Sequence, residues 1–172
     1  MKYLLAFAAA FFLAALGASA MPYVRVLGVT PDLLLIFAAS WAVVRGQSEA
    51  MVVVPVAGLL RDLTASDPLG TSMLALSPIV LLAALRELRA VESNFLPALA
   101  VVAAGTVAYG LISMAVLAAT GQTVPLADAL LRVVLPGALV NALFTPIVYL
   151  PVRWLRPGPR PGSLRLGRPV VS

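Results

Sequence analysis

Hydrophobic residues form six long runs along this chain, separated by short stretches that carry charges, glycine or proline. The runs cover residues 3–20, 33–44, 50–60, 69–85, 95–119 and 126–155. About 20 apolar residues are needed for a helix to cross a typical bilayer, with a usual range of roughly 17–25. The pattern therefore predicts an all-α, polytopic membrane protein with six transmembrane helices.

The second and third runs are short. About twelve residues at 1.5 Å each give a helix of roughly 18 Å, less than the ~30 Å hydrocarbon core. A re-entrant hairpin is the alternative, but it would place Arg45 and Glu49 near the middle of the membrane, at about 2.5 to 3.5 kcal/mol each. We favour two spans whose helices take in the polar residues at their ends. Pro31 suits the first turn of the second helix, and Asp32 suits the positive end of its dipole.

The first run also has the features of a secretory signal. Lys2 precedes it, and Ala18-Ser19-Ala20 at its end is a small-residue sequence typical of a cleavage site. The other five runs need no separate export signal. We therefore expect the first run to be retained as a helix, with cleavage as the alternative.

Composition agrees with a membrane location and removes most catalytic chemistry. The chain is 62% hydrophobic and 11% charged, whereas a soluble domain is nearer half apolar and a quarter charged. It has no His and no Cys, which excludes Cys/His zinc sites, thiol nucleophiles and imidazole acid–base catalysis. There is no glycine-rich phosphate loop with a lysine. We expect no enzyme, no metal and no cofactor.

The cations predict the orientation. With the N-terminus inside, nine of the twelve Lys and Arg residues lie inside and three outside, namely Arg25, Arg61 and Arg132, as the positive-inside rule requires. Both termini are then cytoplasmic. We divide the chain into a membrane domain, 1–155, and a basic tail, 156–172, rich in Pro and Arg and expected to be disordered.

The net charge of +5 has a membrane explanation. The cations stand at the ends of apolar runs and in the tail, where they fix orientation and contact anionic head groups. We therefore expect the phospholipid bilayer as a partner, and no nucleic acid.

Small residues recur every four positions on the first run and lie on one helical face. They are Ala6, Ala10, Ala14 and Ala18. Such faces allow close approach of helix backbones in lipid. We take them as a docking face for another helix, in this protein or in a partner; the alternative is plain alanine richness.

Asn141 is a polar residue midway along the sixth run. An amide in hydrocarbon needs a partner, and Thr106, Tyr109 and Ser113 on the fifth run are candidates. The bond would either hold the bundle together or line a pocket.

Other charges are grouped near the ends of the runs. Asp128 and Arg132 are spaced for a helical ion pair. Arg61-Asp62 and the nearby 67–70 turn suggest an interfacial Arg–carboxylate cluster that closes a loop, with a binding role as the alternative. None of the seven acidic residues lies clearly deep in a run, which counts against a proton pump.

Four motifs follow one another between about residues 30 and 75. They are Pro31-Asp32-Leu33-Leu34, Arg45-Gly46, Gly58-Leu59-Leu60-Arg61-Asp62-Leu63 and Pro68-Leu69-Gly70. In this order and spacing they resemble the MreD family of rod-shape-determining proteins. The chain length and the number of runs also match, while the Arg- and Pro-rich tail departs from the family pattern.

The resemblance implies a non-enzymatic, multi-pass protein of the bacterial plasma (inner) membrane that belongs to the cell-elongation machinery, the elongasome. It implies direct binding of MreC, and indirect links to MreB, RodA and the elongation penicillin-binding protein, with a role in cell shape and lateral peptidoglycan synthesis. It also implies a fold similar to the substrate-binding subunits of energy-coupling-factor transporters. The motif positions, expected to hold the fold and its outer face, are Pro31, Asp32, Gly58, Arg61, Asp62, Pro68 and Gly70.

Two alternatives remain open at this point. A vitamin-type transporter subunit with a pocket in its bundle would also fit the number of runs, the alanine face and Asn141. A lipid-modifying or lipid-flipping protein would rest on charge composition alone.

Overall fold

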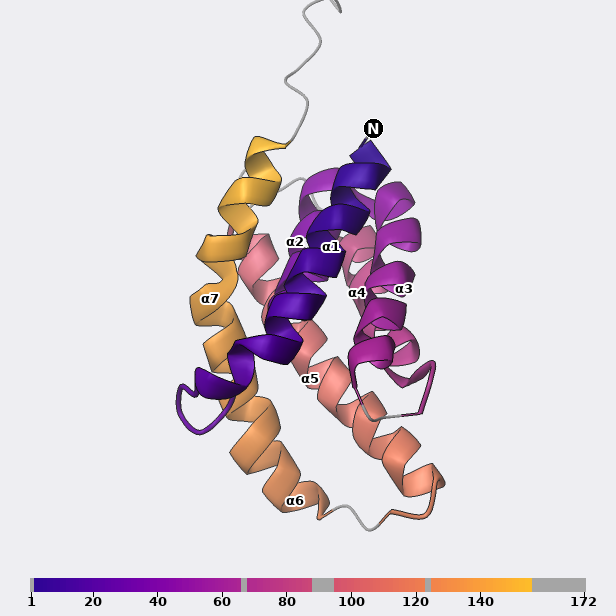
Figure 1. Cartoon of the computed structure of the whole chain (residues 1–172), viewed down its shortest axis with the longest axis vertical. Helices are drawn as coiled ribbons and strands as arrows, with labels where there is room; N and C mark the ends of the chain where they lie inside the picture. The colour runs from indigo at the N-terminus through magenta and orange to yellow at the C-terminus, as the bar shows by residue number, and fades with distance from the viewer. Residues whose placement is uncertain (1, 66–67, 88–94, 123–124, 156–172) are drawn as a thin grey trace, which may run out of the picture.

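The computed structural model describes residues 2–65, 68–87, 95–122 and 125–155, and these residues form a helical bundle (Figure 1). Within these ranges the only β-type pairing is an isolated bridge between Val26 and Val29. The elements are α1 (Lys2–Ser19), the short 3-10 helix η1 (Met21–Tyr23), α2 (Leu33–Arg45), α3 (Gln47–Thr64), α4 (Thr71–Glu87), α5 (Phe95–Ala119), α6 (Leu126–Ala129), the π-helical turn η2 (Leu130–Val134) and α7 (Leu135–Trp154).

Each predicted apolar run is helical, so the all-α prediction is confirmed. Two helices, α5 and the continuous 126–154 rod, are long and apolar enough to cross a membrane, while α1, α2 and α4 contain shorter apolar helices. The six-span count and the orientation stay predictions. The basic tail, 156–172, lies outside the described residues.

The ends of the short runs are taken into helices as expected. Helix α3 has 18 residues because Gln47 to Glu49 and Arg61 to Thr64 extend it at its two ends, which gives about 27 Å of helix. Helix α2 has 13 residues. The prediction for Pro31 was wrong by two positions, because Asp32 is the N-cap and the helix begins at Leu33. Pro31 therefore precedes the first turn.

The charges near the α2–α3 junction are paired. Arg45 Nε lies 3.5 Å from Glu49 Oε2 across the chain reversal at Gly46, and the Arg45 guanidinium lies 5.0 Å from the Trp41 ring centroid. The junction lies at the same end of the bundle as the N-terminus of α1 (Figure 1). These two charges therefore belong to one end of the bundle and not to its middle.

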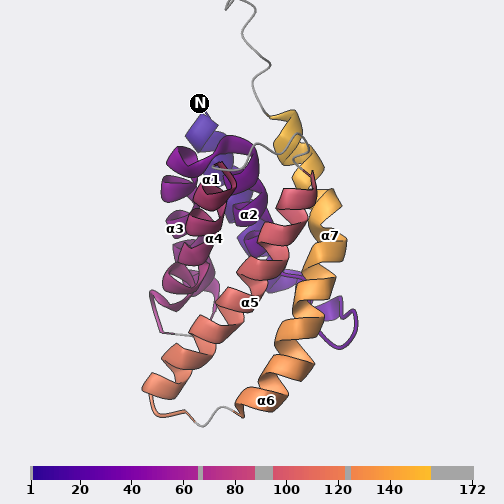
Figure 2. The same cartoon turned by 180° about the vertical axis from the view of Figure 1, so that it is seen from behind.

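Helix α2 is the centre of the bundle. It packs against α1, α3, α4, α5 and α7, and all residues from Leu33 to Val44 are buried. Phe37 and Trp41, one helical turn apart, pack with their rings tilted by 44° and their ring centroids 5.6 Å apart. Figure 2 shows α4, α5 and α7 on the far side of α2 from α1. An apolar helix too short to cross a bilayer is thus covered by its neighbours.

The alanine face of α1 packs inside this protein. Ala6, Ala10 and Ala14 are buried in the core, where α1 lies against α3 and α2. These three alanines are therefore covered by helices of the same chain, and their role as a docking face for a partner stays a prediction. Ala18 differs from them because it is exposed.

The sequence predicted a single helix for the sixth run. In the structure this helix is continuous but not regular. A π-helical turn, Leu130–Val134, separates α6 from α7. Pro136 follows it and has no N–H to donate to the carbonyl of Arg132. The missing bond loosens the register at this point, and π turns of this kind are frequently found at functional sites.

Candidate functional site: a polar network beside a cavity

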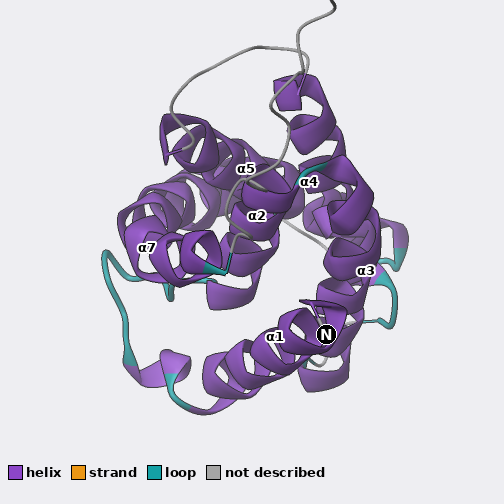
Figure 3. Cartoon of the chain, turned by 90° about the horizontal axis from the view of Figure 1, so that it is seen from above, coloured by secondary structure: helices purple, strands orange, loops and turns teal. Residues whose placement is uncertain are grey.

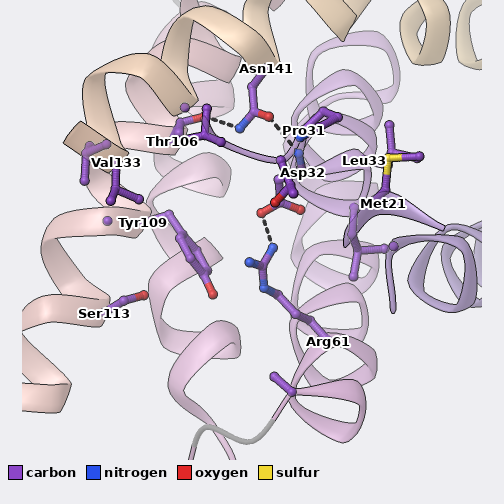
Figure 4. Close-up of a pocket in the computed structure, with 18 of the residues that line it drawn as sticks. Met21, Pro31, Asp32, Leu33, Arg61, Thr106, Tyr109, Ser113, Val133 and Asn141 are labelled. Carbon is purple, nitrogen blue, oxygen red and sulfur yellow. Dashed lines mark hydrogen bonds and ion pairs between the residues drawn. The ribbon is translucent and has the colours of Figure 1, made fainter. Parts of the chain in front are cut away.

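Asp32 joins three parts of the bundle. Its Oδ1 accepts a hydrogen bond from the Leu35 N–H at 3.0 Å and so caps α2. Its Oδ2 is paired with the Arg61 guanidinium from α3. Its backbone N–H donates to Asn141 Oδ1 on α7 at 2.8 Å. The residue therefore fixes the start of α2 between α3 and α7, as Figure 4 shows.

Both the oxygen and the nitrogen of the Asn141 side-chain amide are hydrogen-bonded. Besides accepting from Asp32, it donates from Nδ2 to Thr106 Oγ1 on α5 at 3.0 Å, and only 2% of the residue is exposed. Thr106 is one of the three partners expected from the sequence, whereas the other two, Tyr109 and Ser113, do not bond to Asn141. Tyr109 Oη lies 3.1 Å from Ser72 Oγ, and the buried Ser113 Oγ has no hydrogen-bond partner among the described residues.

Asp62 caps the next helix along the chain. Its two carboxylate oxygens accept hydrogen bonds from the backbone N–H groups of Gly70 and Ser72, each at 2.8 Å. The expected Arg–carboxylate cluster is therefore divided in two, because adjacent residues of a helix point in directions about 100° apart. Arg61 pairs with Asp32, and Asp62 holds the start of α4. Asp67 lies outside the described residues.

The remaining motif residues bring α3 and α4 together. A Cβ on Gly58 would lie 2.5 Å from Met73 Cα, so only glycine allows the two backbones to approach this closely. Gly70 has φ +94°, which favours glycine. The Pro68 carbonyl accepts from the Thr71 N–H and hydroxyl. Gly58, Pro68 and Gly70 thus have structural roles in the α3–α4 junction.

A cavity of about 810 Å³ lies beside this network. Its lining comes from the C-terminal half of α1, the segment from Met21 to Leu34 that ends in the first turn of α2, the end of α3, and the facing parts of α5 and of the α6–α7 rod. Figure 3 shows α1 and α7 on opposite sides of an open ring of helices. Asp32, Arg61, Tyr109 and Asn141 form its polar wall (Figure 4). The Arg61 guanidinium lies 4.5 Å from the Tyr109 ring centroid.

The predicted Asp128–Arg132 pair is present, with Arg132 Nε 3.3 Å from Asp128 Oδ1, and both side chains are exposed. Sequence reasoning missed the Ser72–Tyr109 contact. The contact has no local signal, because it depends on how helices distant in sequence meet. Sequence reasoning left open a pocket beside Asn141, and the residues named for it, Asn141, Thr106, Tyr109 and Ser113, all line the cavity. The π turn was readable in part, from Pro136.

The described residues suit binding and helix–helix contact better than chemistry. Asp32, Asp62 and Asn141 are engaged in hydrogen bonds that hold helices in place. No group of three or more His, Cys, Asp or Glu that could hold a metal occurs in the part of the chain that the structure describes.

Comparison with known proteins identifies the family. The family model described as rod shape-determining protein MreD matches residues 1–156, well beyond the 30–75 region that carries the motifs. No curated protein matches the chain, and no solved structure does. The chain therefore belongs to the MreD family of rod shape-determining membrane proteins.

Proposed function

We propose that this protein is a non-enzymatic, multi-pass scaffold of the bacterial inner membrane that binds the single span of MreC. Through MreC it would reach MreB, RodA and the elongation penicillin-binding protein, and so act on cell shape and lateral peptidoglycan synthesis. The observation that carries this proposal is the family match over residues 1–156. The structural use of Asp32, Asp62 and Asn141 supports a scaffold, because these polar groups are occupied within the bundle.

The outer surface offers large apolar areas for helix contact. On α7 the exposed large side chains include Leu139, Leu143 and Ile147, and α1 exposes Phe11 and Phe12. In a membrane such surfaces face lipid chains or another helix. The helix-docking surface for MreC is therefore to be sought on these exposed faces and not on the buried alanines of α1.

Copurification tests the proposal. Tagged protein extracted in mild detergent should bring down MreC, while an unrelated tagged multi-pass protein at equal expression should not. Absence of MreC from the tagged material, with the protein folded and monodisperse, would contradict the scaffold proposal.

The cavity also allows a test of the transporter-subunit alternative. Its volume, about 810 Å³, lies within the roughly 300–1,000 Å³ of small-molecule sites. A vitamin present at 100 times its Kd would stabilise the protein by about 2.7 kcal/mol, which is visible as a thermal shift. A shift with one vitamin and no copurified MreC would favour the alternative.

A further inference from the structure

The cavity combines apolar walls with a basic rim. Leu13, Met21, Leu34, Met114 and Val133 are among its apolar lining residues. Three of the chain's twelve cationic residues also line it, and these are Arg25, Arg61 and Arg132. A cavity of this composition matches a molecule that has an apolar part and an anionic part.

The cations lie together at one end of the bundle. Arg25 follows η1, Arg61 lies near the end of α3 and Arg132 lies in the turn below α7, and all these elements are at the end of the bundle away from the N-terminus of α1 (Figure 1). Cationic side chains at one end of a membrane bundle lie at the level of lipid head groups.

The charges of the cavity do not cancel. Arg61 is paired with Asp32 and Arg132 with Asp128, while Arg25 has no ion-pair partner among the described residues. Three arginines therefore face two aspartates. The buried, unpartnered hydroxyl of Ser113 also lines the cavity (Figure 4). A cation excess with an available hydroxyl donor favours a phosphate group, which accepts charge-assisted hydrogen bonds from arginine.

The apolar part of the cavity lies between α1 and the α6–α7 rod. Helix α1 packs on α3 and α2, whereas α7 packs on α2 and α5, and residues of both α1 and α7 line the cavity. Many of these residues are small, among them Ala14, Gly17, Ala18 and Gly137. We call this apolar part of the cavity, between α1 and the α6–α7 rod, the seam. Its small, apolar side chains leave space for a hydrocarbon chain.

We propose that this cavity binds one phosphate-bearing membrane lipid. Arg25 and Arg132 contact the phosphate, and a hydrocarbon chain lies in the seam between α1 and the α6–α7 rod. The proposal is independent of MreC binding.

Native mass spectrometry of the purified full chain in detergent tests the proposal. The probes are dioleoyl phosphatidylglycerol, dioleoylglycerol, which lacks the phosphate, and glycerol 3-phosphate, which lacks the chains. We expect one bound phosphatidylglycerol. Dioleoylglycerol should bind at least about tenfold more weakly, since loss of one charged hydrogen bond corresponds to about that factor, and glycerol 3-phosphate should bind at least about tenfold more weakly because it buries no hydrocarbon chain.

Two pairs of variants locate the site. The double variant Arg25→Gln/Arg132→Gln should weaken phosphatidylglycerol binding about tenfold or more, while Arg153→Gln, at an exposed position of α7 outside the cavity, should not.

Gly137→Leu should fill the seam, because the nearest atom to a Cβ there is Thr106 Cγ2 at 3.9 Å. Its control is Ala104→Leu on the exposed face of α5. An unchanged melting temperature confirms that each variant is folded; should Gly137→Leu not fold, the arginine pair decides alone.

Three results would overturn the lipid site. Equal binding of glycerol 3-phosphate would show a site for a soluble phosphate compound. Unchanged binding by the double arginine variant would place the lipid elsewhere. Loss of MreC copurification in Gly137→Leu, with phosphatidylglycerol binding intact, would show that the seam takes a partner helix.

Discussion

Helices α2 and α5 have similar apolar sequences and opposite environments. Helix α2 has 13 residues, and every residue from Leu33 to Val44 is buried. Helix α5 has 25 residues, and 28% of its most apolar window is buried. Hydropathy alone does not distinguish them. Length does, because a helix of about 20 Å cannot match a ~30 Å hydrocarbon core on its own, while α5 can face lipid along its length.

The regions around these two helices, α2–α4 and α5–α7, are also held together by different kinds of contact. The α2–α4 region uses close backbone approach at Gly58, the buried carboxylate of Asp62 and the part-buried carboxylate of Asp32. The α5–α7 region uses side-chain packing and the Asn141–Thr106 bond. Substitutions in the α2–α4 region should therefore cost more stability than comparable substitutions in the α5–α7 region.

The largest expected effect is at Gly58. Gly58→Ala places a Cβ against the backbone of Met73, which cannot rotate away, so we expect a loss of about 2–3 kcal/mol. Gly137→Ala is the matched control in the α5–α7 region, because its Cβ would meet only Thr106 Cγ2, at an ordinary contact distance of 3.9 Å. Thermal unfolding in detergent measures both. Equal losses would remove the distinction between the two regions.

Asn141→Ala should have the next largest effect, a loss of about 1–2 kcal/mol. It leaves the Asp32 N–H and the Thr106 hydroxyl without their present partner in a buried place. Leu143→Ala, on the exposed side of the same helix, is the control in thermal unfolding. A stability of Asn141→Ala indistinguishable from that of the control would show that the amide does not hold α7 to α2 and α5.

The Asp32–Arg61 pair should contribute less, about 1 kcal/mol of coupling. The two side chains are 16% and 29% exposed, so solvent screens part of their attraction. Asp32→Asn keeps the shape of the side chain and removes its charge, and Arg61→Gln removes the guanidinium. Their double-mutant cycle isolates the pair from the cap that Asp32 provides to α2. Additive losses would mean that Asp32 acts through its cap and Asn141 alone.

The sequence predicted the helices well and the site in part. Apolar runs set the position of α5 to the residue, and Asp32 was recognisable as a helix start. The partner of Arg61 was not predictable, because Asp62 is adjacent in sequence and Asp32 is 29 residues away. The alanines of α1 indicated helix contact, yet only the packing shows that the contact is with α3 and α2. Five separate segments line the cavity, so the sequence indicated a pocket beside Asn141 but not the other walls of that pocket.

The smallest expected effect is at the exposed pair Asp128–Arg132. Both groups are more than half exposed, at 65% and 81%, so solvent and salt weaken their interaction. Asp128→Asn should therefore change stability by only about 0.3–0.5 kcal/mol, and 0.5 M salt should abolish the difference from the unmodified chain. The same substitution at the other pair, Asp32→Asn, should keep most of its effect at that salt concentration. Equal salt sensitivity at the two sites would show that the Asp32–Arg61 pair is as open to solvent as the surface pair, and would contradict its role as an internal link between α2 and α3.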